Sequence, residues 1–367
     1  MAGIVIVVII LGCGLNQYFK GTLVKGFVSL IVAFSASIIA FGYFEALAGL
    51  LIGEPESPRL GAVAPWGLTI SFVLLFAVSF GLLQTIAAQL IPQKLQLPQI
   101  AEKAGRVIAG FFLGLFVSGL LITALDISPL PSGYPYPRYQ QNNPEPRNPS
   151  KVFLNADGFA SGFFSLVSKG SMSAEQSFAV LHADFPGQAF LNRLAPEAKL
   201  LTGPDIIQVP SKAALWYAPE GLKDAAGNEV QAKAGERIMV ARVGLRSAQK
   251  FTLSQLRFLC KKKGQMSNPL KGKATPIYPG GYIAEQSRVK EIDLGEVIEV
   301  RPGDFSEGLL WFDFVFAVPE EMIPSLVQFK QSITIQLPGP VSGEQVPELK
   351  PFPPVPEAQE DAEPQSE

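Results

Sequence analysis

The 367-residue chain is poor in the side chains that most often bind metals, with one histidine (His182) and two cysteines. A single histidine excludes a histidine-rich metal site, and we expect no cofactor. Cys13 lies in an apolar stretch and Cys260 in a β-rich stretch far downstream, so we expect no disulfide between them, and the cysteines do not indicate a redox compartment. The net charge of -2 leaves no basic face for a nucleic-acid partner.

The first 126 residues lack charge at the centres of four long apolar stretches, at about 4–18, 27–44, 66–91 and 107–125. Only 17% of the chain is charged, compared with about 25% in typical soluble proteins. A bilayer core about 30 Å thick requires roughly 20 helical residues, and two or three of the stretches reach that length. The sequence therefore predicts an all-α four-helix bundle at residues 1–128, with the lipid bilayer around it.

Other interpretations of the apolar stretches are less favoured. A cleaved signal peptide has basic residues before its apolar region, whereas Lys20 and Lys25 follow the first stretch. Buried helices of a soluble protein would need polar neighbours to cover them, and residues 1–126 offer almost none. The first stretch is short and contains Gly12 and Gly14, so a re-entrant segment remains an alternative to a thin, tilted span. That alternative would invert the topology of everything downstream.

Basic residues in short loops indicate the cytoplasmic side of a membrane protein. The second loop, about residues 45–65, is acidic overall, whereas the first and third are basic. The basic residues of those two loops are Lys20, Lys25, Lys94, Lys103 and Arg106. We therefore predict that both termini and the C-terminal two-thirds of the chain are extracytoplasmic.

The fourth stretch carries a series of spaced glycines: Gly105, Gly110, Gly114 and Gly119. Gly110 and Gly114 form a GxxxG pattern, which lets two helix backbones approach closely in lipid. Glycine is also common in membrane helices generally, but the recurrence along one stripe favours a helix-packing face. The interiors of the stretches contain no aspartate, glutamate, lysine, arginine or histidine, which disfavours a proton-coupled transporter.

Two segments resemble the CvpA family of colicin V production proteins. The first, GLNQYFKGTLVKGFVSLIVAF, matches that family's first-loop motif at Gly14, Tyr18, Lys20 and Gly21. The second, IAEKAGRVIAGFFLGLFVSGLL, is similar at Arg106, Gly110 and Gly114. The resemblance covers about residues 1–128, although Ala2 and Gly3 stand where the family has an acidic residue. It implies a four-span protein of the bacterial inner membrane, associated with toxin production or export and with envelope maintenance, in a family with no agreed molecular activity.

Four further segments follow the helices. Residues 129–150 are rich in proline and predict a semi-rigid polyproline II linker. Residues 151–200 have apolar residues at helical spacing, and this amphipathic segment is expected either to pack on the next domain or to lie flat on the outer leaflet. Residues 201–337 change to a period of two, with about seven short strands, which predicts an antiparallel β-sandwich of immunoglobulin-like type. Residues 338–367 are rich in proline and acid and predict a disordered tail.

The β-rich segment offers only weak site candidates. A basic loop could meet phosphate head groups or acidic glycans, or could be an ordinary solvated hairpin loop; its residues are Lys261, Lys262, Lys263, Lys271 and Lys273. A serine-protease triad is disfavoured because His182 precedes the β-rich segment and no GDSG-like stretch exists. Asp304 and Glu307 have no opposing carboxylate that would suggest a glycosidase.

We therefore expect a non-enzymatic, CvpA-like inner-membrane protein that displays a periplasmic β-sandwich to an unknown envelope partner. Its helices would associate with one another in self-assembly or with other membrane proteins. A first alternative is an accessory subunit of a channel or transporter, with a water-filled path lined by Asn16, Gln84 and Gln89. A second is a membrane-tethered hydrolase.

Overall fold

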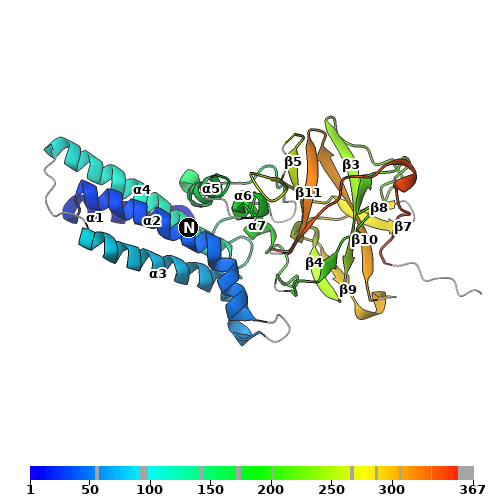
Figure 1. Ribbon diagram of the computed structural model, residues 1–367, viewed down its shortest axis with the longest axis horizontal. Coiled ribbons are helices and arrows are strands. Elements are labelled where there is room, and N and C mark those ends of the chain that lie inside the picture. The colour runs from blue at the N-terminus through cyan, green and yellow to red at the C-terminus, as the bar shows by residue number, and fades with distance from the viewer. Residues whose placement is uncertain are drawn as a thin grey trace, which may run out of the picture.

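The computed structural model arranges the chain as an elongated molecule with a helical end, a helical connector and a β-rich end (Figure 1). The residues that it describes are 1–53, 58–90, 98–140, 144–170, 175–200, 202–264, 268–285, 288–305, 308–331 and 333–353. Parts of the loops used above to orient the chain, residues 54–57 and Lys94, lie outside the described residues, as does Glu307.

The N-terminal end consists of four long helices: α1 (Ala2–Lys20), α2 (Leu23–Ile52), α3 (Gly67–Leu90) and α4 (Gln99–Asp126). All four are long and apolar enough to be candidate membrane spans, with α3 extended by the 3-10 helix Gly61–Trp66. The prediction of four packed apolar helices is confirmed, and these helices suggest a multi-pass membrane protein.

The four helices form an open row in the order α1, α4, α2, α3. The main contacts of α1 are with α4, those of α4 also include α2, and α3 packs mainly against α2. Most of α1 and α3 is therefore exposed, including large apolar side chains such as Val8 and Leu82. Water would not favour so much contiguous apolar surface, whereas a bilayer would cover it.

Helix α1 is continuous through Gly12 and Gly14. At about 1.5 Å per residue its 19 residues extend about 28 Å, close to the thickness of a bilayer core of about 30 Å. The end of α1 and the start of α2, and likewise the end of α3 and the start of α4, lie at the end of the row away from the β-rich region (Figure 1). This arrangement fits a complete crossing by α1 better than a re-entrant segment.

The connector comprises η2 (Phe153–Asn155), α5 (Ala156–Ser168), α6 (Phe178–Leu181) and α7 (Phe185–Leu191). A cluster of aromatic rings joins it to the long helices. The rings are those of Phe34, Phe41, Phe44, Phe72, Phe116, Phe159, Phe163, Phe164, Phe178 and Phe185. Phe34 stacks on Phe163 at 4.4 Å and Phe41 on Phe164 at 5.2 Å. Segment 151–200 thus packs on protein, and its main apolar partners are the long helices.

The proline-rich segment after α4 lies against the protein and does not extend away from it as a spacer. Tyr136 and Tyr139 are buried with Phe190 of α7. The guanidinium of Arg193 donates to three backbone carbonyls of this segment, those of Ser128 (3.5 Å), Leu130 (3.1 Å) and Tyr134 (3.1 Å). These contacts hold the segment at the end of α7.

The β-rich region is mainly antiparallel, as predicted. Its strands are β1 (Ile207–Gln208), β2 (Leu215–Tyr217), β3 (Glu236–Leu245), β4 (Gln249–Thr252), β5 (Leu256–Lys262), β6 (Thr275–Ile277), β7 (Gly281–Glu285), β8 (Arg288–Glu291), β9 (Val297–Val300), β10 (Leu310–Pro319), β11 (Met322–Phe329) and β12 (Ile333–Gln336). One sheet has the order β1-β3-β10-β7-β8 with β2 also on β3, a second has β12-β11-β5-β6, and β4 pairs with β9.

The two larger sheets share one apolar core. Phe312, Phe314 and Phe316 alternate along β10 and point into it, as the period-two pattern predicts. Across the core, Phe258 of β5 stacks on Phe316 at 3.6 Å. The finer prediction of an immunoglobulin-like sandwich stays a prediction.

The described part of the C-terminal segment is packed against the β-rich region. Phe352 is buried in the shared core, and its backbone N–H donates to the carbonyl of Ile283 at 2.9 Å. Lys350 N–H donates to the carboxylate of Asp313 at 2.7 Å. Order therefore continues to residue 353, beyond the predicted boundary at 338, and residues 354–367 lie outside the described residues.

Candidate functional site

The structure places Gly110 and Gly114 against α1. A Cβ at Gly110 would lie 2.8 Å from the Cα of Gly14, and one at Gly114 would lie 2.6 Å from the Cα of Ile10. Such distances are too short for a side chain, so the GxxxG pattern serves a close approach of two helices within the chain. This surface is therefore occupied by α1 and is not free for a second copy.

The other two glycines of the stripe meet different neighbours. A Cβ at Gly105 would lie 2.3 Å from a methyl of Leu23, and one at Gly119 would lie 2.1 Å from the carbonyl oxygen of Ala156. Gly119 thus permits the start of α5 to rest directly on α4.

Lys20, Gly21 and Arg106, three of the residues that carry the resemblance to the CvpA family, lie at the end of the row distant from the β-rich region. Arg106 pairs with Glu102 at 2.8 Å and donates to the carbonyl of Tyr18 at 3.4 Å. Glu102 in turn accepts the N–H of Leu23 at 3.0 Å, so one ion pair contacts the end of α1 and the start of α2. Gly21 is required at this turn because a Cβ there would lie 2.6 Å from the carbonyl oxygen of Gln17. Lys20 is exposed beside it.

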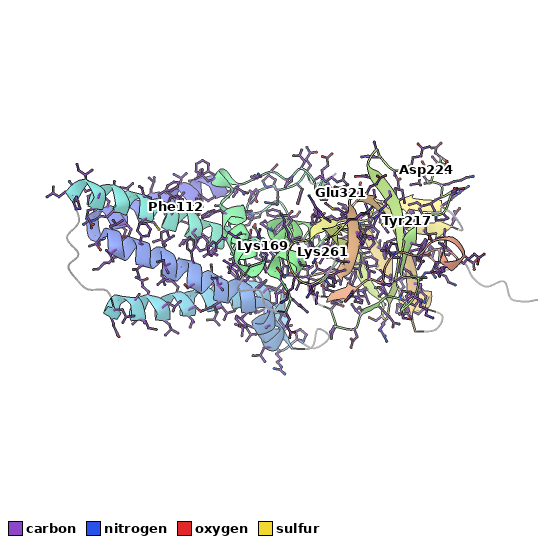
Figure 2. The ribbon with its side chains drawn as sticks, turned by 45° about the horizontal axis from the view of Figure 1, so that its top comes forward. Phe112, Lys169, Tyr217, Asp224, Lys261 and Glu321 are labelled. Carbon is purple, nitrogen blue, oxygen red and sulfur yellow. The ribbon has the colours of Figure 1, made fainter. Side chains whose placement is uncertain are left out.

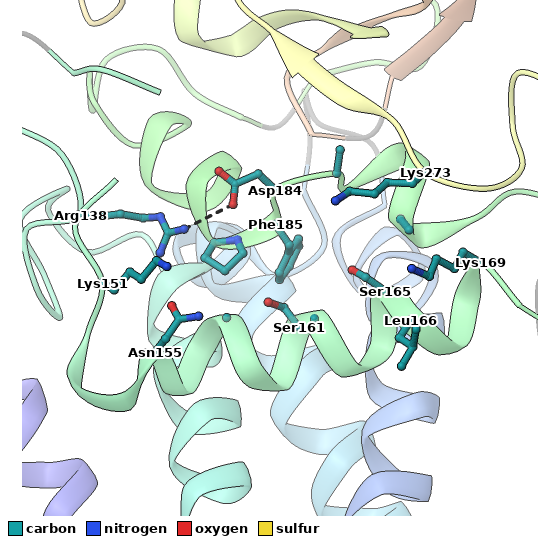
Figure 3. Close-up of a pocket in the computed structure, with 15 residues that line it drawn as sticks. Arg138, Lys151, Asn155, Ser161, Ser165, Leu166, Lys169, Asp184, Phe185 and Lys273 are labelled. Atoms are coloured by element: carbon teal, nitrogen blue, oxygen red, sulfur yellow. Dashed lines mark hydrogen bonds and ion pairs between the residues drawn. The ribbon is translucent and has the colours of Figure 1, made fainter. Parts of the chain in front are cut away.

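A pocket of about 460 Å³ lies at the connector, between the long helices and the β-rich region (Figure 3). Among the described residues that line it, four are cationic (Arg138, Lys151, Lys169 and Lys273) and one, Asp184, is acidic. Figure 3 shows Lys151 at one end and Lys169 and Lys273 at the other, and Figure 2 places Lys169 where the helices meet the connector. The pocket is therefore electropositive.

Helix α5 forms the floor of this pocket because its two faces differ. Its apolar face, including Ala160 and Phe164, packs on the long helices. Its other face presents Ser161, Gly162 and Ser165 to the pocket. Among the described residues, an added Cβ at Gly162 would meet nothing within 4 Å, so the floor leaves room there.

A buried ion pair closes one end of the pocket. Arg138 lies 3.3 Å from Asp157, which is fully buried, and 3.4 Å from Asp184. The phenol of Tyr136 donates to Asp157 at 2.5 Å. Burial, reinforced by the Asp157 carboxylate, raises the pKa of Tyr136, so the phenol stays protonated as a donor. The ring of bonds fixes the proline-rich segment to α5 and α7.

A second polar cluster joins the long helices to the β-rich region. His182 is buried, with Nδ1 2.9 Å from the amide oxygen of Gln188 and Nε2 3.5 Å from Glu45. Glu45 also accepts from the amide of Gln331 at 3.0 Å. These contacts place His182 in the junction, and among the described residues neither a serine nor a cysteine is its hydrogen-bond partner.

Two glutamines and an arginine extend this junction into the sheets. Arg257 of β5 donates to the carbonyl of Leu181 at 2.9 Å and to the amide oxygen of Gln328 at 2.7 Å. Gln255 donates to the carbonyl of Ala198 at 2.7 Å. The β-rich region is therefore held on the connector by directional bonds as well as by apolar contact.

The lysine-rich loop divides between two environments. Lys261 is buried and donates to the backbone carbonyls of Asn268 and Lys271, and burial lowers its pKa. Lys262 and Lys263 are exposed, while Lys273 lines the pocket. The sequence indicated phosphate head groups as one partner for this loop, but it did not connect Lys273 with Lys169, which lies about one hundred positions earlier.

Lys330, in the turn between β11 and β12, allows the burial of this turn to be tested. Burial lowers its pKa to about 8. Between that value and its unfolded pKa near 10.4 the unfolded chain binds more protons, so stability should rise with pH over this range, by up to about 3 kcal/mol. Below pH 8 both states are protonated and the burial penalty remains. Thermal unfolding of the detergent-solubilised protein from pH 7 to 10 measures the rise.

The Lys330→Met variant should be more stable than the native chain at pH 7 and should lose this part of the pH dependence. Equal pH dependence in both proteins would show that Lys330 is not buried in the charged form.

The comparisons with known proteins assign no relative. No family model, curated protein or solved structure matches the chain. Across the described ranges, no group of three or more histidine, cysteine, aspartate or glutamate side chains could hold a metal ion.

Proposed function

We propose that the protein is a non-enzymatic, CvpA-like membrane anchor that holds a β-rich binding domain at a fixed position on the extracytoplasmic side of a bacterial inner membrane. The observation that carries the proposal is the continuous packing from the long helices through the connector to the sheets. The aromatic cluster provides the apolar part, and the bonds of Glu45, Arg257 and Gln255 provide the directional part. A domain fixed in this way presents one orientation to an envelope partner.

The charge distribution supports the proposed side. Lys20, Lys25 and Arg106 lie at the end of the helical row distant from the β-rich region. Basic loop residues favour the cytoplasmic side, which leaves the β-rich domain outside.

The position of the polar residues gives the channel alternative no support. Gln84 donates to Ser29 at 3.2 Å, whereas Asn16 and Gln89 are exposed. The three side chains do not line one internal path. Self-association through the GxxxG pattern is also disfavoured, because α1 covers it.

Two experiments test the proposal. A reporter active only in the cytosol should be inactive when fused after Glu367, and it should be active when inserted beside Lys25. The fusion point lies beyond Phe352 because that residue is buried in the β core. Copurification from native membranes, with the β-rich region intact and with it deleted, should then recover a partner only with the intact chain. A cytosolic C-terminus would overturn the proposed side, and identical copurified proteins would overturn the binding role.

A further inference from the structure

The electropositive pocket over α5 gathers charge from three distant parts of the chain. Arg138 comes from the proline-rich segment, Lys151 and Lys169 from the two ends of the α5 region, and Lys273 from the lysine-rich loop. Within the described residues, none of the three lysines forms an ion pair. The one acid, Asp184, already contacts Arg138 and caps α7 by accepting from Gly187 N–H at 3.3 Å. Three cations therefore remain available to an anion.

The pocket lies at the level where the helices leave the membrane. The first turn of α1 adjoins η2, since a Cβ at Gly3 would lie 3.6 Å from that of Phe153. From that level α1 extends about 28 Å to the opposite end of the row, close to the full bilayer core of about 30 Å. Helix α5 thus starts at the membrane–water boundary on the β-rich side.

Exposed apolar side chains accompany the cations at this level. Leu166, which lines the pocket, is 60% exposed, and Phe153 and Leu154 at the start of α5 are about half exposed. A soluble anion would gain nothing from these side chains. An amphiphile would place its charged group among the lysines and its chain beside Leu166.

We propose that this pocket binds the phosphate-bearing headgroup of an anionic membrane lipid from the leaflet on the β-rich side. Lys169 and Lys273 would contact the phosphate, the hydroxyl of Ser165 would donate to its oxygens, and Leu166 would contact the first part of the acyl chain. Lys151, at the other end of the pocket, would add to its positive charge. Basic pockets beside membrane helices are suited to lipid head groups, and the volume of about 460 Å³ is in the range of small-molecule sites. The bound lipid would bridge the connector and the lysine-rich loop.

The test is lipid binding by the full chain. The purified protein in a neutral detergent is titrated with phosphatidylglycerol or phosphatidylcholine and observed by native mass spectrometry. Phosphatidylglycerol should be retained in preference to phosphatidylcholine. The double variant Lys169→Gln/Lys273→Gln should weaken phosphatidylglycerol binding about tenfold or more, because it removes two charge-assisted contacts. The matched control, Lys262→Gln/Lys263→Gln, makes the same charge change at exposed positions and should bind normally.

Two further arms separate a lipid from a soluble phosphate. Leu166→Ser should weaken phosphatidylglycerol binding and leave the weak binding of glycerol 3-phosphate unchanged. Glycerol 3-phosphate binding as tight as the lipid would overturn the lipid as the occupant. Equal loss in the two lysine double variants, or equal retention of both lipids, would overturn the site.

Discussion

Replacement of Gly114 by leucine is expected to separate α1 from α4 and to lower the thermal unfolding midpoint by about 5–10 °C. A Cβ at this position would already lie 2.6 Å from the Cα of Ile10 and 3.2 Å from the carbonyl oxygen of Ile9. These are backbone atoms and cannot rotate away, so the helices must move apart. Overpacking of this kind costs about 1–3 kcal/mol or more, and each kcal/mol corresponds to a few degrees in a protein of this size.

The matched control is Gly81→Leu on α3. It makes the same substitution in an apolar helix, but a Cβ there meets no atom within 4 Å in the described part of the chain. Its unfolding midpoint, measured by heating the detergent-solubilised protein before size-exclusion chromatography, should equal that of the native chain. An equal fall for both variants would mean that Gly114 does not pack against α1.

Removal of the Asp157 carboxylate should have the other large effect. Asp157→Ala leaves Arg138, which is 5% exposed, without its fully buried partner. Arg138 would keep only its 3.4 Å contact with Asp184, whose side chain is one-third exposed. Removal of one partner of a buried ion pair typically costs about 3–5 kcal/mol, so the midpoint should fall by about 10 °C. The free phenol of Tyr136 would also lose its acceptor. The proline-rich segment should become more accessible to protease.

Two variants make this prediction specific. The double variant Asp157→Ala/Arg138→Met removes both fully buried charges and should recover much of the lost stability, because the only charge that loses its partner, that of Asp184, is partly exposed. Glu299→Ala breaks the exposed pair with Lys250 and should change stability by less than about 1 kcal/mol. A double variant no better than Asp157→Ala would show that the ion pair is not what holds this segment.

Local patterns in the sequence predict the helices and the strands well, for a physical reason. Apolar length alone defines a membrane helix, and alternation alone places Phe312, Phe314 and Phe316 on one face of β10. Both patterns, the apolar stretch and the alternation, lie within about twenty consecutive residues, so each can be recognised without knowledge of the rest of the chain.

The junction could not be predicted in this way because its contacts join residues far apart in the chain. Glu45 and Gln331 are separated by 286 positions, and no local period relates them. The pocket could not be predicted for the same reason, because Lys169 and Lys273 are brought together only when the lysine-rich loop packs on the connector. Proline content likewise predicted a spacer at residues 129–150, but it carried no signal of the Arg193 contacts that hold the segment in place.

The fixed position of the β-rich region on the helices is tested most directly by a cross-link between α2 and the β11–β12 turn. Cysteines replacing Glu45 and Gln331, in a chain with Cys13 and Cys260 changed to serine, are treated in native membranes with a short thiol-to-thiol reagent. Because the side chains of Glu45 and Gln331 are 3.0 Å apart, the structure predicts efficient intramolecular cross-linking between cysteines at these two positions. In the control, the cysteine replacing Gln331 is combined with one replacing Leu82 on the exposed side of α3, and little cross-linking is expected. Equal cross-linking of the two pairs, or none in either, would contradict a docked β-rich region.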